Sequence, residues 1–189
     1  PEGYGVVSCY NTLPLGGGSH TLVRLDLSAS ARRHEGDIEQ YLTETLPEHV
    51  ELTFEVIEAR VRYLVEEAGF FENSFLVDEG LIHPERFTAM FGIFGMAELI
   101  EALAPEPRYG YDAAAAELSR RVIEVVAGIV EGREVAHCRN GRATLHAQSG
   151  IDSDSGVSAG ARLKIGTEPE VIDHILTVAP HHHHFASGI

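Results

Sequence analysis

Cys9 is the residue whose type and position in the sequence most directly suggest chemistry. It stands near the end of a short β-prone run over residues 3–11 and beside a turn-rich loop over residues 13–19. A cysteine placed in this way can be presented into a cavity, where its sulfur acts as a thiolate or as a thiyl radical. A free cysteine is also commonly a small buried hydrophobe, and its reactivity depends on its surroundings. Cys138, in a turn after a predicted helix, is the reserve candidate.

Three other motifs suggest different chemistry. The tract His181–His184 could bind a metal ion, or it could be a polar loop that lines a site. Ser158 stands in the G-x-S-x-G pattern of serine hydrolases, which requires a strand before it and a helix after it. Here a loop precedes the motif and a strand-like segment over 161–165 follows, which favours a chance match. Gly16–Gly18 lack the Lys-Ser/Thr ending of a phosphate-binding loop and predict a turn between two strands.

The composition narrows the class of protein. Acidic residues outnumber basic ones by 29 to 14, the formal charge is -15, and no basic stripe is present, which argues against nucleic-acid binding. No apolar run is long enough to cross a bilayer. Two cysteines are too few for a disulfide scaffold, so we expect a reducing, cytoplasmic setting. The chain of 189 residues begins with Pro1 rather than Met, and we expect one domain, an internal fragment cut at both ends.

The elements that must position these residues alternate between strands and helices. Strand-like patterns flank a largely helical middle, and Pro47 is expected to separate the first two helices, over 35–46 and 48–68. The second of these has one face formed by Leu52, Val56, Ala59, Tyr63 and Val65 or Glu66, which is largely apolar. The other predicted strands cover 3–11, 20–27, 75–77, 143–147 and 161–165. Further helices are predicted from 83, after the run 92–97 to an end near 104, over 111–131 and over 169–176. This order predicts an α/β fold with interior strands and helices packed outside.

Several long and unusually composed blocks of the chain resemble the YjjI family of glycyl radical enzymes. They include the runs GVVSCYNTLPLGGGS and MFGIFGMAE and cover residues 5–19, 21–25, 70–77, 80–87, 90–98, 146–151 and 179–184. The order of features is more remotely similar to that of anaerobic (class III) ribonucleotide reductases. The resemblance implies a fragment of a ten-stranded α/β barrel in which two finger loops meet, one with a cysteine and one with a radical-bearing glycine.

The resemblance also implies a mechanism and its partners. An iron–sulfur, S-adenosylmethionine-dependent activating enzyme would install the glycyl radical under anaerobic conditions. That radical would oxidise Cys9 to a thiyl radical, which abstracts hydrogen from a small-molecule substrate. The Arg-Val-x-Gly-Tyr loop that bears the glycine is absent from this sequence, so we expect the glycine to lie outside it and the fragment to be inactive alone. A homodimer is the expected assembly.

Polar side chains near these blocks are the expected substrate-binding residues. They would orient the substrate inside a dry barrel, where their placement matters more than their titration. The set consists of His20, Arg24, Glu72, Asn73, His146 and Gln148. We expect no metal ion at this site; a non-catalytic metal-binding or assembly module that uses His181–His184 is the alternative reading.

Overall fold

The described part of the chain contains a short hairpin and a parallel sheet. The computed structural model describes residues 3–6, 12–107, 111–146, 166 and 170–172. Strand β1 (Tyr4–Val6) pairs antiparallel with β2 (Thr12–Pro14). A three-stranded parallel sheet follows, with β3 (Gly18–Asp26), β4 (Phe87–Phe94) and β5 (Thr144–Leu145) in the order β3-β4-β5. The predicted α/β class is therefore confirmed, whereas a complete ten-stranded barrel remains a prediction.

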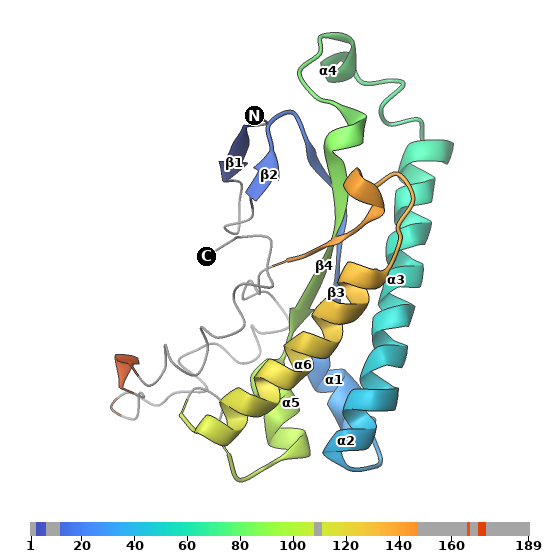
Figure 1. Ribbon diagram of the computed structural model, residues 1–189. Coiled ribbons are helices and arrows are strands. Elements are labelled where there is room, and N and C mark those ends of the chain that lie inside the picture. Colours follow the sequence, from blue (N-terminus) through green and yellow to red (C-terminus); the bar gives the residue numbers. More distant parts are fainter. Residues whose placement is uncertain (1–2, 7–11, 108–110, 147–165, 167–169, 173–189) are drawn as a thin grey trace.

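Helical crossovers join the parallel strands, as a parallel arrangement requires. Between β3 and β4 lie α1 (Leu27–Arg32), α2 (Ile38–Gln40), η2 (Tyr41–Thr45), α3 (Leu46–Arg62), η3 (Tyr63–Glu67), α4 (Phe75–Asp78) and η4 (Pro84–Arg86). Between β4 and β5 lie α5 (Met96–Leu103), α6 (Ala113–Gly132) and η5 (Arg139–Gly141). Helices α3 and α6 pack against each other and against the sheet, while α1 and α5 pack together below the ends of β3 and β4 (Figure 1). Among the described residues, no helix is long and apolar enough to span a membrane.

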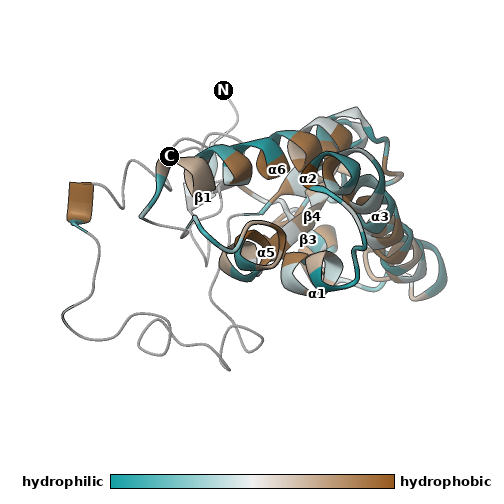
Figure 2. Cartoon of the chain, turned by 90° about the horizontal axis from the view of Figure 1, so that it is seen from below, coloured by the Kyte–Doolittle hydropathy of each residue, from teal (hydrophilic) through white to brown (hydrophobic). Residues whose placement is uncertain are grey.

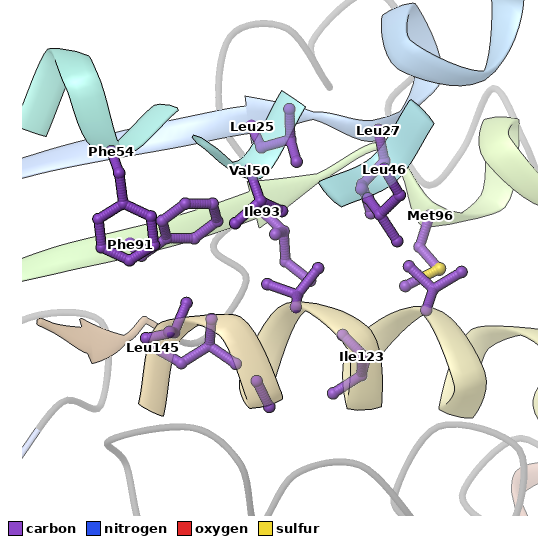
Figure 3. Packing of buried hydrophobic residues seen from close by; sticks show 14 of the residues in the cluster. Leu25, Leu27, Leu46, Val50, Phe54, Phe91, Ile93, Met96, Ile123 and Leu145 are labelled. Carbon is purple, nitrogen blue, oxygen red and sulfur yellow. The ribbon is translucent and has the colours of Figure 1, made fainter. Parts of the chain in front are cut away.

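The hydrophobic core lies between α3, α6 and one face of the sheet. Alternate residues of β4, namely Ala89, Phe91 and Ile93, belong to this core and are at most 2% exposed. The centroid of the Phe91 ring lies 5.2 Å from that of Phe54 on α3. Ile123 of α6 contributes to the same hydrophobic cluster from the other helix (Figure 3). Seen from below, strands β3 and β4 lie between helices α1, α3, α5 and α6 (Figure 2). This alternation leaves the even-numbered residues of β4 for the opposite face of the sheet.

Helix formation continues through Pro47, and the predicted helix end there is wrong. The residues on either side of the junction, Thr45 and Leu46, have right-handed helical dihedrals. Proline removes one backbone donor and its ring crowds the carbonyl of the preceding turn, which normally breaks a helix. Here the preceding turn, η2, has π-helical bonding, with the Leu46 N–H donating to the Tyr41 carbonyl. The wider turn accommodates the proline without ending the helix.

The apolar stripe predicted for α3 does not face the core. Leu52 and Val56 are about half exposed, at 49% and 48%, and Tyr63 is 61% exposed. The buried face is the neighbouring one, which includes Val50 and Ile57, both 0% exposed. Helix α3 is apolar on two sides, so its periodicity alone could not identify the buried side.

Two further predictions for the middle of the chain were wrong. Residues 75–77 belong to helix α4 rather than to an extended stretch, and Pro84 opens only the single 3₁₀ turn η4. Strand β4 then follows, although a helix was predicted from residue 83. Every residue of β4 except Phe94 is buried, so the strand has no polar alternation to mark it. The predictions of β3, α6 and β5 are confirmed, and the predicted strand over 161–165 lies outside the described residues.

Candidate functional site

A bulge in β3 decides which polar side chains share a face of the sheet. Ser19 pairs with Thr88 and Leu22 pairs with Met90, so two residues of β3 lie opposite one residue of β4. An extra residue of this kind moves all later side chains to the other face. His20, before the shift, therefore lies on the helix-covered face, whereas Leu22 and the residues that alternate with it lie on the opposite face.

Arg24 and His146 lie in one row across this opposite face. Arg24 pairs with Gly92 on β4, and the Phe91–Leu145 pair places the next residue, His146, opposite Gly92 on the other side. The His146 N–H donates to the Phe91 carbonyl at 2.8 Å, which continues the sheet ladder. The structure thus brings together two of the predicted substrate-binding residues, although they are 122 positions apart in the sequence.

Gly92 provides the space between these two side chains. A Cβ atom at this position would lie 2.7 Å from Cγ of Arg24 and 3.2 Å from Cδ1 of Leu22. The arginine stem therefore lies against the backbone of Gly92. Sequence analysis did not single out Gly92, but an isolated glycine inside an aromatic, apolar strand is a signal for close approach of another group.

His20 is held on the helix-covered face by three contacts. Its Nε2 donates to the His137 carbonyl at 2.9 Å, and its ring packs against those of Phe71 and Phe87, with centroids 5.7 and 5.5 Å away. Its Nδ1 is buried and has no hydrogen-bond partner among the described residues. Burial is the main cause that lowers the pKa of His20, opposed by the hydrogen bond to His137, whose own charge lowers it further. Burial thus disfavours the charged form of His20, which lies apart from the Arg24 row.

The lowered pKa of His20 predicts a specific loss of stability in mild acid. The unfolded chain binds a proton near the ordinary value of 6.5 while the folded chain does not, so stability falls as pH drops from 6.5 toward the folded pKa. Gln in place of His20 keeps a donor for the His137 carbonyl but cannot titrate. We therefore expect His20→Gln to lose less stability than the natural protein between about pH 7.5 and pH 5.5, as measured by urea unfolding. An equal loss of unfolding free energy in both proteins would show that the titration of His20 does not cause the loss.

Glu72 and Asn73 lie in the turn that follows η3 and do not join the Arg24 row. The Asn73 Nδ2 donates to the Gly69 carbonyl at 2.8 Å, and its backbone N–H donates to the same oxygen at 3.1 Å. Gly69 has a φ of +58°, a conformation that glycine adopts readily. Asn73 therefore stabilises a helix-ending turn, while the side chain of Glu72 is exposed. Gln148, His181–His184 and Ser158 lie outside the described residues.

Cys9 also lies outside the described residues, but its neighbours in the chain are described. Val6 pairs with Thr12 at the inner end of the β1–β2 hairpin, so Cys9 belongs to the connection over residues 7–11 between the two strands. A tight turn then leads from β2 into β3: the Gly17 N–H donates to the Pro14 carbonyl at 2.9 Å, and Gly16 has a φ of +72°. The predicted glycine turn between two strands is confirmed, and only a few residues separate the hairpin from the sheet.

Cys138 occupies a structural position in the core. Its Sγ accepts a hydrogen bond from the backbone N–H of Ala89 at 3.2 Å, and the side chain is 8% exposed. Burial raises the pKa of the Cys138 thiol, outweighing the opposing hydrogen bonds from Ala89 and Thr88. The thiolate, which is the nucleophilic form, is therefore disfavoured. In the described part of the chain, no group of three or more His, Cys, Asp or Glu side chains is arranged to hold a metal ion.

The buried thiol of Cys138 should resist alkylation in the folded protein. We expect iodoacetamide at about pH 8 to leave Cys138 unmodified in the native state and to modify it fully in urea, because unfolding restores both access and an ordinary pKa. Mass spectrometry of the peptide that contains Cys138 measures both states. Rapid native labelling would show that the thiol is accessible.

Comparisons with known proteins identify the family of this chain. The family model described as "Glycyl radical enzyme YjjI-like" matches residues 1–189. The chain is 50% identical over 191 residues to the uncharacterized protein YjjI of Escherichia coli (strain K12), and covers 37% of that protein. It is 34% identical over 196 residues to an uncharacterized protein of Haemophilus influenzae (strain ATCC 51907 / DSM 11121 / KW20 / Rd), and covers 38% of it. In both matches 99% of this chain is aligned, so the chain spans little more than a third of these relatives.

Solved structures of an anaerobic ribonucleotide reductase have a similar fold. The anaerobic ribonucleotide reductase from Thermotoga maritima, crystallised with citrate in the active site, aligns over 86% of this chain and 32% of its own, with a TM-score of 0.64 and 17% identity. The same enzyme with MES in the active site aligns over 69% of this chain and 22% of its own, with a TM-score of 0.56 and 21% identity. These alignments show a shared fold, and the match to the family model over the whole length shows that the chain belongs to the YjjI-like family of glycyl radical enzymes.

Proposed function

We propose that this chain is the part of a glycyl radical enzyme that carries the catalytic cysteine, Cys9. The family match over residues 1–189 is the observation that carries the proposal. The described hairpin supports it, because Cys9 lies in the connection between β1 and β2, and β2 is followed almost at once by β3. Under this proposal the chain is one internal segment of a larger barrel domain, and the radical glycine belongs to another part of the full-length protein.

The proposed chemistry of Cys9 is hydrogen-atom transfer. A glycyl radical, installed by an iron–sulfur, S-adenosylmethionine-dependent activating enzyme, supplies the unpaired electron. Cys9 gives the hydrogen atom of its S–H bond to that radical, so a C–H bond forms on the glycine and the sulfur becomes a thiyl radical. The Cys9 sulfur then takes a hydrogen atom from a C–H bond of the substrate, which re-forms the S–H bond and leaves the radical on the substrate. Each transfer moves one proton and one electron together, so the charge of Cys9 does not change.

Among the predicted substrate-binding residues, Arg24 and His146 are the pair that we propose to contact the substrate. They share the sheet face opposite α3 and α6, with Gly92 between them. His20 donates a hydrogen bond to the His137 carbonyl on the other face, and Asn73 donates one to the Gly69 carbonyl. The substrate is a small molecule, and the crystallised reductase of the same fold held citrate in its active site. An anaerobic cytoplasmic setting and a homodimer complete the proposal.

The proposal is tested by electron paramagnetic resonance on the full-length protein. The protein is incubated without oxygen with its activating enzyme, S-adenosylmethionine and a reductant. We expect a doublet signal, because the unpaired electron of a glycyl radical couples to the single remaining α hydrogen. Exposure to oxygen should then cleave the chain at the radical glycine, which mass spectrometry of the products locates. No doublet and no cleavage, with an activating enzyme shown to cleave S-adenosylmethionine, would exclude a glycyl radical enzyme.

A further inference from the structure

We propose that Arg24, with His146 across Gly92, binds an oxoanion group of the substrate, either a carboxylate or a phosphate. This inference rests on the proposed function and adds to it the chemical class of the substrate. It predicts that the substrate is an anion that is held by a bidentate guanidinium contact on the face of the sheet opposite α3 and α6.

The first argument is that the buried Nε of Arg24 has no hydrogen-bond partner among the described residues. The other partly buried arginines in the described part of the chain each donate to a neighbouring group. Their partners are Leu15 for Arg86, Glu117 and Glu124 for Arg120, Glu39 for Arg121, Glu51 and Glu58 for Arg133, and Tyr4 for Arg139. Arg24 differs from all of these, because its Nε is buried and has no hydrogen-bond partner in the part of the chain that the structure describes. A buried donor without a partner costs free energy, and an incoming acceptor would relieve that cost.

The second argument is that acidic side chains are abundant in this protein, and yet none in the described part of the chain forms an ion pair with Arg24. The chain carries 29 acidic and 14 basic residues. The partly buried arginines Arg120 and Arg121 of α6, and Arg133 directly after this helix, form ion pairs with glutamates. A guanidinium forms two parallel hydrogen bonds with a carboxylate or phosphate, a geometry that a lysine ammonium cannot reproduce. A partly buried arginine left without such a group is therefore available for one that comes from a ligand.

The third argument is the geometry of the row. Gly92 lies between the two side chains and carries none of its own, and the stem of Arg24 passes over it. Neighbouring strands lie about 4.8 Å apart, so the backbones of Arg24 and His146 are separated by roughly 10 Å. This span is wide enough for a small oxoanion between a guanidinium and an imidazole. His146 is 3% exposed, and an imidazole side chain can donate to an anion or accept from a hydroxyl, according to its tautomer.

The test measures anion binding by the full-length protein without activation. Isothermal titration with citrate and, separately, with inorganic phosphate is carried out at constant ionic strength, so that general screening does not change. We expect at least one of the two anions to bind, and the better one identifies a carboxylate or a phosphate as the preferred group. Arg24→Gln should weaken that binding by about tenfold or more, because it removes a charge-assisted bidentate contact. Arg24→Lys keeps the charge but loses the bidentate geometry, so its affinity for the anion should lie between those of the natural protein and Arg24→Gln.

Arg62→Gln is the matched control, since it removes the same charge from an exposed position in the last turn of α3. It should leave the affinity unchanged. Because Arg24 has no partner among the described residues, Arg24→Gln should melt no lower than the natural protein in the absence of anions. A melting temperature that falls sharply would assign Arg24 to the folded scaffold and contradict the inference.

The outcomes separate this inference from the proposed function. Unchanged anion affinity in Arg24→Gln, equal losses in Arg24→Gln and Arg62→Gln, or a Kd above about 10 mM for both anions would overturn the anion site. The glycyl radical signal is recorded on the same preparations. A radical that forms in Arg24→Gln with anion binding lost supports both conclusions. A natural protein that binds the anion through Arg24 and forms no radical would refute the enzyme class while the anion site stands.

Discussion

Alanine in place of Cys9 should leave the glycyl radical intact and abolish its exchange with solvent. The hydrogen on a thiol exchanges freely with water, so in D₂O Cys9 carries deuterium. Transfer of that deuterium to the glycyl radical, followed by return of the radical, replaces the α hydrogen of the glycine with deuterium. The doublet of the natural protein should therefore collapse to a narrow signal in D₂O, whereas Cys9→Ala should keep its doublet. This measurement needs no knowledge of the substrate.

Cys138→Ala is the control for this experiment. Cys138 belongs to the hydrophobic core, and its Sγ accepts a hydrogen bond from the Ala89 backbone, so it has no place in hydrogen transfer. The variant should show the same collapse of the doublet as the natural protein, and once the substrate is known it should retain turnover while Cys9→Ala falls to background. A doublet that still collapses in Cys9→Ala, or one that persists in Cys138→Ala, would assign the transfer to Cys138.

The second large effect concerns the two apolar sides of α3. Leu46 is 0% exposed and belongs to the core, whereas Leu52, six residues later on the same helix, is 49% exposed. Leu46→Ala removes buried contacts and leaves a cavity, so we expect it to lower the free energy of unfolding by about 2–5 kcal/mol. Leu52→Ala deletes the same atoms from a half-exposed position and should cost about 0.5 kcal/mol or less.

Urea unfolding of the full-length protein and both variants measures this difference. The midpoint of the transition should fall strongly for Leu46→Ala and hardly at all for Leu52→Ala, with similar slopes. Both substitutions introduce the same residue into the same helix, so helix propensity cancels in the comparison. A loss at Leu52 equal to that at Leu46 would show that the Leu52 side of α3 is covered in the full-length protein.

The family and the general class of fold could be inferred from the sequence because they depend on local and contiguous signals. Strand β3 has a run of alternating apolar residues, and α6 is an alanine-rich segment that ends at a glycine. The turn at Gly16 needs a positive φ that glycine supplies, and the family blocks are continuous in the chain. None of these features depends on which distant segment packs against them.

The arrangement of the site depended on the tertiary structure. The bulge after Ser19 places His20 on one face of the sheet and Arg24 on the other, and no residue pattern in β3 marks it. The register across β4 brings His146 opposite Gly92 and so into the row of Arg24. Likewise, only packing against the sheet selects which apolar side of α3 is buried. Strand pairing and helix packing are set by contacts between residues far apart in the chain, whereas sequence patterns report the preferences of neighbours.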